Sequence, residues 1–169
     1  TEGTDLFNIG NLVYSRRIGE VTKINTADNE SVEEYPNSIQ LINAVKISGR
    51  TKSGLGIGVL NAITENTTVQ VENADTNTSR LETLQPLANY NVMVLDQRFR
   101  KNSTVSLINT NVTRSGSYRD ANVTAGVFDL NTKRNTFNLK GDFKYSFIND
   151  DFLLEDQKGY NTSLLFAET

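Results

Sequence analysis

The chain has 169 residues and a net charge of −3, with 37% hydrophobic and 22% charged residues. It contains no cysteine and no histidine, which excludes disulfide scaffolds, thiolate or imidazole metal sites and His-dependent catalysis. The mild acidity argues against nucleic acid as a partner, because binding to phosphates needs a basic surface.

The length fits one domain-sized unit. No apolar run approaches the roughly 20 residues that a transmembrane helix needs. No signal peptide is recognisable, and the sequence opens at Thr1 rather than Met, so we expect a mature chain or a piece of a longer one. We treat residues 1–169 as one segment, with an initial strand and a long loop in residues 1–38 and successive β-hairpins in residues 39–169.

Hydrophobic residues alternate with polar ones along most of the chain, which predicts β-strands. In chain order the expected strands are an uncertain one at Asn11–Glu20, then Ile39–Arg50, Ser53–Thr64, Leu87–Phe99, Ser103–Arg114, Ala121–Leu130, Thr136–Ile148 and Gly159–Ala167. In the first long strand, one predicted face carries Ile39, Leu41, Val45 and Ile47. Short polar turns alternate with long polar loops at residues 24–38 and 65–86. The pattern predicts an all-β, antiparallel, up-and-down protein.

Three glycines alternate with aliphatic residues in the second long strand. Gly54, Gly56 and Gly58 occupy one predicted face, and the other face carries Leu55, Ile57 and Val59. Glycine weakens a strand, so three on one face indicate that another group approaches closely there or that the sheet bends. The spacing lacks the G-x-G-x-x-G pattern of a phosphate-binding loop.

Strand length fits a membrane β-barrel, but the pattern alone leaves a barrel and a soluble sandwich equally open. Several predicted strands span roughly 10 to 13 residues, against 5 or 6 in ordinary sheets and 9 to 11 in tilted membrane strands. In a barrel the apolar face meets lipid and the polar face lines the lumen. The predicted lipid-facing residues are Leu55, Ile57, Val59, Leu139, Phe143, Tyr145 and Phe147, and the predicted lumen-facing residues are Gly54, Gly56, Gly58, Lys140, Asp142 and Lys144. A soluble β-sandwich that binds carbohydrate or protein is the alternative, since it would bury the same apolar face.

Four blocks of sequence carry a resemblance to a known family. In order they are EGTDLFNIGNLVYSRRIGE, INAVKISGRTKSGLGIGVLNAIT, PLANYNVMVLDQRFRKNSTVSLINTNVTR and YRDANVTAGVFDL, and the resemblance runs from Glu2 to about Lys140. The chain resembles the C-terminal β-barrel region of Bacteroidota outer-membrane proteins of unknown function, whose N-terminal domain is similar to family-nine carbohydrate-binding modules. The resemblance implies an outer-membrane location in a Gram-negative bacterium. The carbohydrate-binding-like domain and most of the barrel are absent from this sequence.

Seven or eight strands are too few for a barrel with loops of this length, so we expect one arc of a larger wall. The expected partners are outer-membrane lipid, the remainder of the parent barrel and other outer-membrane or periplasmic subunits. No cofactor or metal is expected, and the acidic residues near Asp150 are interpreted as a solvated hairpin tip. We therefore predict a non-enzymatic segment that serves transport, envelope assembly or surface glycan handling.

Overall fold

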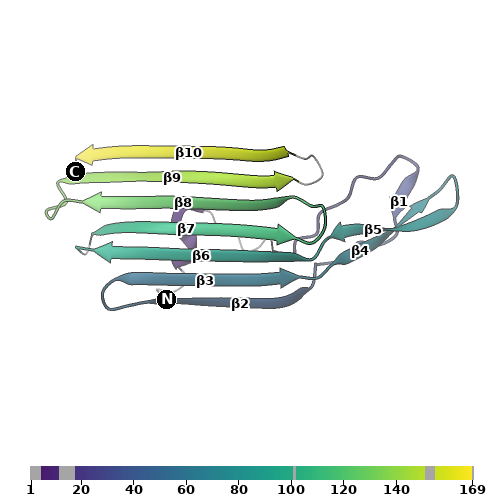
Figure 1. The fold of residues 1–169 in the computed structure, drawn as a ribbon, viewed down its shortest axis with the longest axis horizontal. Coiled ribbons are helices and arrows are strands. Elements are labelled where there is room, and N and C mark those ends of the chain that lie inside the picture. The colour runs from purple at the N-terminus through teal and green to yellow at the C-terminus, as the bar shows by residue number, and fades with distance from the viewer. Residues whose placement is uncertain (1–4, 12–17, 101, 151–154, 169) are drawn as a thin grey trace.

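A seven-stranded antiparallel sheet dominates the structure, a computed structural model that describes residues 5–11, 18–100, 102–150 and 155–168. Its strand order is β10-β9-β8-β7-β6-β3-β2, and Figure 1 shows these strands side by side. The strands are β2 (Leu41–Arg50), β3 (Leu55–Thr64), β6 (Ala88–Phe99), β7 (Ser103–Arg114), β8 (Asp120–Asn131), β9 (Phe137–Asp150) and β10 (Glu155–Glu168). Strands adjacent in this sheet pair in the order of an up-and-down meander, which confirms the predicted all-β antiparallel class.

The seven long predicted strands are confirmed with small shifts at their ends, and the one at Ser103–Arg114 has the predicted bounds. Three short turns, at residues 51–54, 100–102 and 132–136, lie at one end of the sheet, which we call the short-turn end. The opposite end, on the right in Figure 1, carries the connections from β3 to β6 and from β7 to β8. We call it the long-connection end.

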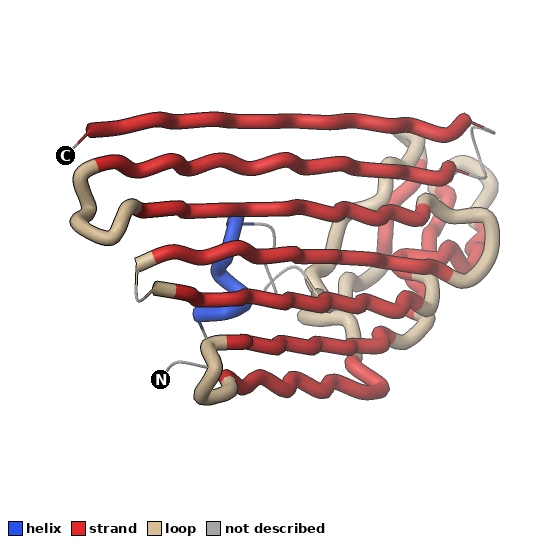
Figure 2. The backbone as a smooth tube through the Cα atoms, turned by 60° about the vertical axis from the view of Figure 1, so that its left-hand side comes forward, coloured by secondary structure: helices blue, strands red, loops and turns tan. Residues whose placement is uncertain are grey.

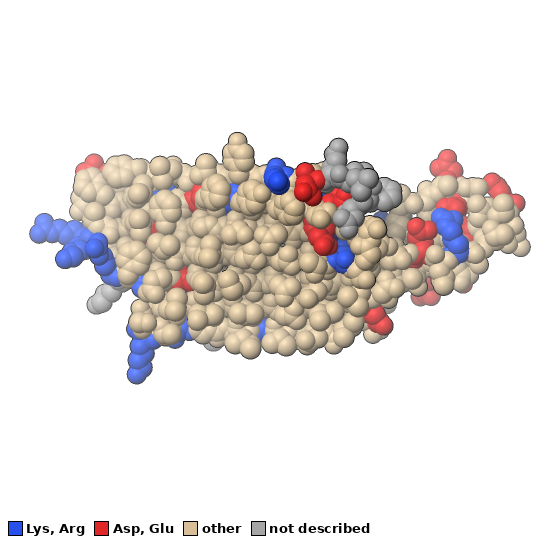
Figure 3. Space-filling view, in the orientation of Figure 1, with Lys and Arg blue, Asp and Glu red and all other residues tan. Residues whose placement is uncertain are grey.

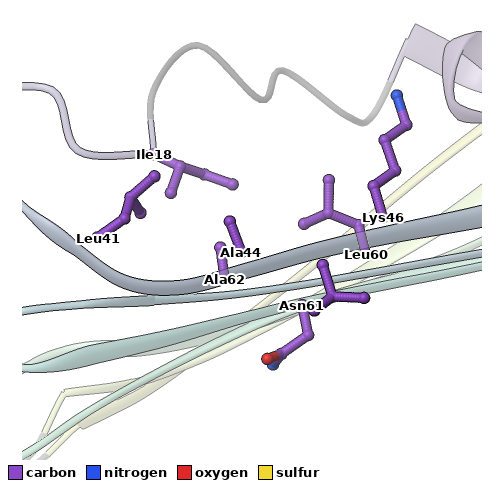
Figure 4. Close-up of a pocket in the computed structure, with 8 residues that line it drawn as sticks. Ile18, Leu41, Ala44, Lys46, Leu60, Asn61 and Ala62 are labelled. Carbon is purple, nitrogen blue, oxygen red and sulfur yellow. The ribbon is translucent and has the colours of Figure 1, made fainter.

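The predicted face of the first long strand was wrong at two positions. A bulge between Leu41 and Asn43 shifts the register, so Leu41 lies opposite Thr64 and on the same side of the sheet as Leu60 (Figure 4). An inserted residue reverses the side to which the preceding side chains point. Ile39 precedes the strand altogether and is buried against Val69 and Leu84.

The prediction of a long loop at residues 65–86 was also wrong, because this segment contains two strands. A three-stranded sheet has the order β1-β4-β5, with β1 (Glu30–Val32), β4 (Thr67–Asn73) and β5 (Thr78–Gln85). It extends from the long-connection end of the large sheet (Figure 1). Val69 and Leu84 form a small core of their own with Ile39. These strands form because Val69 and Val71 alternate with polar residues and bury one side of the hairpin.

The N-terminal residues form a short 3-10 helix, η1 (Asp5–Asn11), which contacts β3, β6, β7 and β8. Figure 2 shows it lying across one side of the sheet. The uncertain strand at Asn11–Glu20 falls mostly on residues 12–17, outside the described residues. Among the described residues, no helix is long and apolar enough to span a membrane.

The large sheet therefore has two distinct faces. The helix-side face bears η1 and buries a cluster that includes Leu60, Val92, Val94 and Ile108. We call the opposite one the open face, because no described residue covers it. Figure 3 views the open face, where uncharged atoms cover most of the strands and basic side chains project at the short-turn end. Alternate residues of each strand reach alternate faces, which is the expected β-sheet geometry.

Candidate functional site

The alternating glycines of β3 lie beneath η1. A Cβ added at Gly56 would lie 2.7 Å from Leu6 Cδ2, and one added at Gly58 would lie 3.0 Å from Phe7 Cζ. Leu6 and Phe7 are 1% and 4% exposed. Glycine is required at Gly56 because any larger residue would occupy the space of the helix side chain.

Gly56 also allows an ion pair to form across β3. It lies directly opposite Arg50 on β2 and Asp96 on β6. The guanidinium Nη2 of Arg50 donates to Asp96 Oδ2, and its Nη1 donates to the carbonyl oxygen of Gly54 at 2.7 Å. Only 10% of the Arg50 side chain and 4% of the Asp96 side chain are exposed. A buried pair of this kind is costly to break, because each charge depends on the other after desolvation.

Further polar groups extend this row toward β10. Ser106 donates from Oγ to Asp96 Oδ1 at 2.7 Å. Next along the same face, Asp142 accepts a hydrogen bond from Ser163, and Lys144 Nζ lies 3.4 Å from Asp142 Oδ2. Lys140 Nζ lies 3.0 Å from Asp129 Oδ2. The helix-side face thus combines an apolar core under η1 with paired charges on β8 and β9 and a hydroxyl partner, Ser163, on β10.

The predicted lumen-facing and lipid-facing residues separate onto the two faces. Gly56, Gly58, Lys140, Asp142 and Lys144 lie on the helix-side face. The open face carries Leu55, Ile57, Val59, Leu139, Phe143, Tyr145 and Phe147. Of these, Ile57 is 43% exposed and Phe143 is 54% exposed. The structure thus gathers each predicted set on one face of the sheet.

Gly54 differs from the other two glycines because it precedes β3 and belongs to the turn. Its φ of +91° lies in the left-handed region, and an added Cβ would lie 2.6 Å from the carbonyl oxygen of Arg98. The turn itself therefore requires glycine here. The prediction of a strand position for Gly54 was wrong, because the predicted strand begins at Ser53 and the turn instead extends two residues further, through Gly54.

The acidic segment near β10 provides no metal cluster among the residues that the structure describes. The interpretation as a solvated hairpin tip was wrong for Asp150, which ends β9 and is buried, with its Oδ2 accepting from Arg119 Nε at 3.3 Å. Residue 151 lies outside the described residues. Over those same described ranges, no three Asp or Glu side chains come together in a way that would hold a metal ion.

A family model described as "Domain of unknown function (DUF5916)" matches residues 1–169, which is the whole chain. The chain belongs to the DUF5916 family. No curated protein matches it, and no solved structure matches it. Membership of DUF5916 fits the expectation of a family without an established activity.

Two features of this DUF5916 chain were missed by the sequence reasoning. One is the pair between Arg50 and Asp96, whose positions become neighbours only once the register of β2, β3 and β6 is known. The other is a set of asparagines on the open face. Their signal was present as the repeats NYN at residues 89–91 and NTN at residues 109–111, where i and i+2 share a face.

Proposed function

We propose that this chain forms part of the wall of an outer-membrane β-barrel, with its open face toward lipid and its helix-side face toward the lumen. The observation that carries the proposal is the exposure of apolar side chains at alternate positions on a face that no described residue covers. Val59 is 45% exposed, Phe143 is 54% exposed and Leu164 is 72% exposed. Large exposed apolar patches are rare on soluble monomers. In hydrocarbon, each such side chain gains roughly 1.5 to 3 kcal/mol relative to water.

The dimensions of the sheet support the same function. Its strands have 10 to 14 residues, and a tilted strand of about 9 to 11 residues crosses a bilayer. The turns at one end are short, as they are at the periplasmic end of bacterial barrels. The basic residues Lys52, Arg100 and Lys133 lie in those turns.

The sheet edges define the partner that this proposal requires. In the described residues, β2 and β10 each pair on one side only. Unpaired backbone groups in hydrocarbon cost several kcal/mol each. Further strands of the parent barrel therefore complete the wall in the proposed assembly, and η1 lies inside the lumen.

The proposed role is non-enzymatic, in transport, envelope assembly or surface glycan handling, with the barrel alone or as a subunit of a larger outer-membrane complex. The carboxylates of the helix-side face are engaged by basic or hydroxyl partners, as in Asp96 with Arg50 and Asp142 with Ser163. Such pairs suit a rigid polar wall. General acid–base catalysis instead needs a carboxylate directed at a substrate.

Fractionation of cells that produce the full-length protein tests the proposal. We expect the protein in the outer-membrane fraction, with a folded band that migrates differently from the boiled sample on a gel. Recovery only in the soluble fraction, with no such shift on boiling, would contradict the proposal and favour the β-sandwich.

A further inference from the structure

Four asparagines form a continuous row across the open face. Asn61 on β3 lies directly opposite Asn91 on β6, which lies opposite Asn111 on β7, which lies opposite Asn122 on β8. Figure 4 shows Asn61 pointing to the other side of the sheet from Leu60 and Ala62. Directly opposed residues of an antiparallel sheet share a face. A row of uncharged amides therefore crosses a face that is otherwise largely apolar.

Hydrogen bonds join the asparagines of the row to their neighbours on the same face. They form two groups, one on each side of Asn111. Asn61 Nδ2 donates to Asn89 Oδ1 at 2.7 Å and to Asn91 Oδ1 at 2.8 Å. On the other side, Asn109 Nδ2 donates to Asn122 Oδ1 at 3.1 Å and to Thr124 Oγ1 at 2.8 Å.

Asn111 lies between these two groups and is half-buried. Its side chain makes no hydrogen bond to the residues that the structure describes. The amide of asparagine offers two donors and an acceptor. Because Asn111 is only half-buried, water can satisfy these groups in the free protein, and a ligand can replace that water. The centre of the row therefore presents hydrogen-bonding groups that a polar ligand can use.

An apolar groove lies beside the amide row, toward the short-turn end. It has a volume of about 310 Å³, and its lining includes Val105, Gly126, Phe128, Phe143 and Leu164. Nothing lies within 4 Å of a Cβ added at Gly126, so the floor of the groove is open there. Gly126 lies four positions beyond Asn122 on β8, which corresponds to about 13 Å along the strand. A single amphiphilic molecule can span the groove and the row.

Aromatic side chains continue the row toward β10. Asn122 lies opposite Phe147, and Tyr145 lies opposite Tyr160 in the adjacent row. Aromatic rings offer flat apolar faces with a polar tip in the case of tyrosine. Amides together with such rings suit a ligand that has both hydroxyl groups and apolar ring faces, as sugars do.

We propose that the open face binds a glycolipid, with an uncharged sugar headgroup over the asparagine row and its alkyl chain in the groove at Gly126. This inference rests on the proposed function, because it requires the open face to meet lipid. A phosphate headgroup would call for Arg or Lys partners. The open-face positions of β3, β6 and β7, all of which the structure describes, carry no charged residue. Within the described residues, the row meets a cation only at its far end on β10, where Lys158 lies opposite Phe147 with its Nζ 5.7 Å from the centroid of that ring.

The test uses the full-length protein in a detergent without sugar, dodecyldimethylamine oxide. Native mass spectrometry measures how much added dodecyl maltoside stays bound, against dodecylphosphocholine, which has the same alkyl chain. We expect retention of dodecyl maltoside in preference to dodecylphosphocholine. Asn111→Leu should weaken retention of dodecyl maltoside about tenfold, as expected when a hydrogen-bonding partner is lost. Gly126→Leu, which fills the groove, should weaken it as well.

Asn161→Leu is the matched control, because Asn161 is exposed on the helix-side face of β10. It should leave retention of dodecyl maltoside unchanged. Equal retention of the two detergents, or equal loss in the Asn111 and Asn161 variants, would overturn the inference. A change in oligomeric state in Asn111→Leu without a change in retention would also overturn it, in favour of an interface between copies. The heat-modifiable band on a gel separates the two proposals. If retention gives one of these contrary results while every variant keeps a normal band, only the glycolipid inference fails. Loss of the band would contradict the proposed barrel itself.

Discussion

Arg50 and Asp96 form their ion pair across the full width of β3, and the guanidinium passes over Gly56. A Cβ added at Gly56 would lie 2.9 Å from Arg50 Nη2 and 2.7 Å from Leu6 Cδ2. The absence of a side chain on one residue therefore serves two contacts, the ion pair and the docking of η1. This relationship links three strands to the N-terminal helix and sets several expectations for stability.

Removal of the charge of Asp96 should destabilise the fold. Asp96→Asn leaves the Arg50 guanidinium buried without a counter-charge, and we expect a loss of about 3 to 5 kcal/mol in the free energy of unfolding. Urea unfolding of the refolded protein measures this change in the free energy of unfolding. The control Asp28→Asn changes an exposed carboxylate and should have little effect.

A double variant separates lost charge pairing from lost packing. Arg50→Met combined with Asp96→Leu removes both charges and should recover most of the lost stability, since apolar replacements of buried pairs are often neutral. If Asp96→Asn shifts the unfolding midpoint no more than Asp28→Asn does, the pair contributes nothing to stability.

Addition of a methyl group under η1 should also destabilise the protein. Gly56→Ala forces Leu6 and Arg50 to move, and overpacking of this kind costs about 1 to 3 kcal/mol. Gly126→Ala is the matched control, because nothing lies within 4 Å of its added Cβ. Unfolding midpoints of the two variants give the comparison. Equal midpoints would show that Gly56 is not required by its neighbours.

The docking of η1 depends on Phe7. The ring is 4% exposed and lies 4.4 Å from Lys46 Nζ, measured to the ring centroid. Phe7→Ala should cost about 3 to 5 kcal/mol, as other buried aromatic truncations do. Asn8→Ala, in the exposed part of the same helix, should cost far less. A small and similar effect of both changes on the unfolding midpoint would mean that η1 adds little to the fold.

The small sheet should respond to acid through Glu30. Arg80 Nη2 donates to Glu30 Oε2 at 3.1 Å, and this hydrogen bonding lowers the pKa of the Glu30 carboxyl. Because the pKa is lower in the folded state, the contribution to stability is complete above the ordinary glutamate pKa. It is lost as the pH falls through the lowered pKa.

Carboxyl NMR titration measures that pKa directly. Arg80→Ala should raise the midpoint of the Glu30 titration, while Lys133→Ala, in a distant exposed turn, should leave it unchanged. An unchanged titration midpoint in Arg80→Ala would show that the contact with Arg80 does not lower the pKa of Glu30.

The sequence predicted the long strands well because apolar residues alternate with polar ones over ten or more positions in the clearest of them, Thr136–Ile148. It missed β4 and β5 because their alternation is short and lies in a segment rich in Asn and Thr. The helix η1 was also missed, since two apolar residues, Leu6 and Phe7, do not define a period. The bulge at Leu41 produces no local signal and depends on pairing with β3.

The candidate site was predictable only in part, for a related reason. Face membership follows from alternation alone, so Gly56 and Lys144 were placed together on one face correctly. Contacts across strands need the register, which joins residues 46 positions apart in the case of Arg50 and Asp96. The asparagine row on the open face likewise exists only when four strands are aligned.

The exposure of neighbouring residues of β9 to lipid and to water tests the central proposal most directly. Phe143→Cys and Lys144→Cys place a spin label on opposite faces of the same strand. The labelled full-length protein, with any cysteine outside this chain replaced by serine, is reconstituted in lipid vesicles. We expect lipid-soluble oxygen to relax the label at residue 143 and a water-soluble nickel complex to relax the label at residue 144. Relaxation of the label at residue 143 mainly by the nickel complex would contradict a lipid-facing open face.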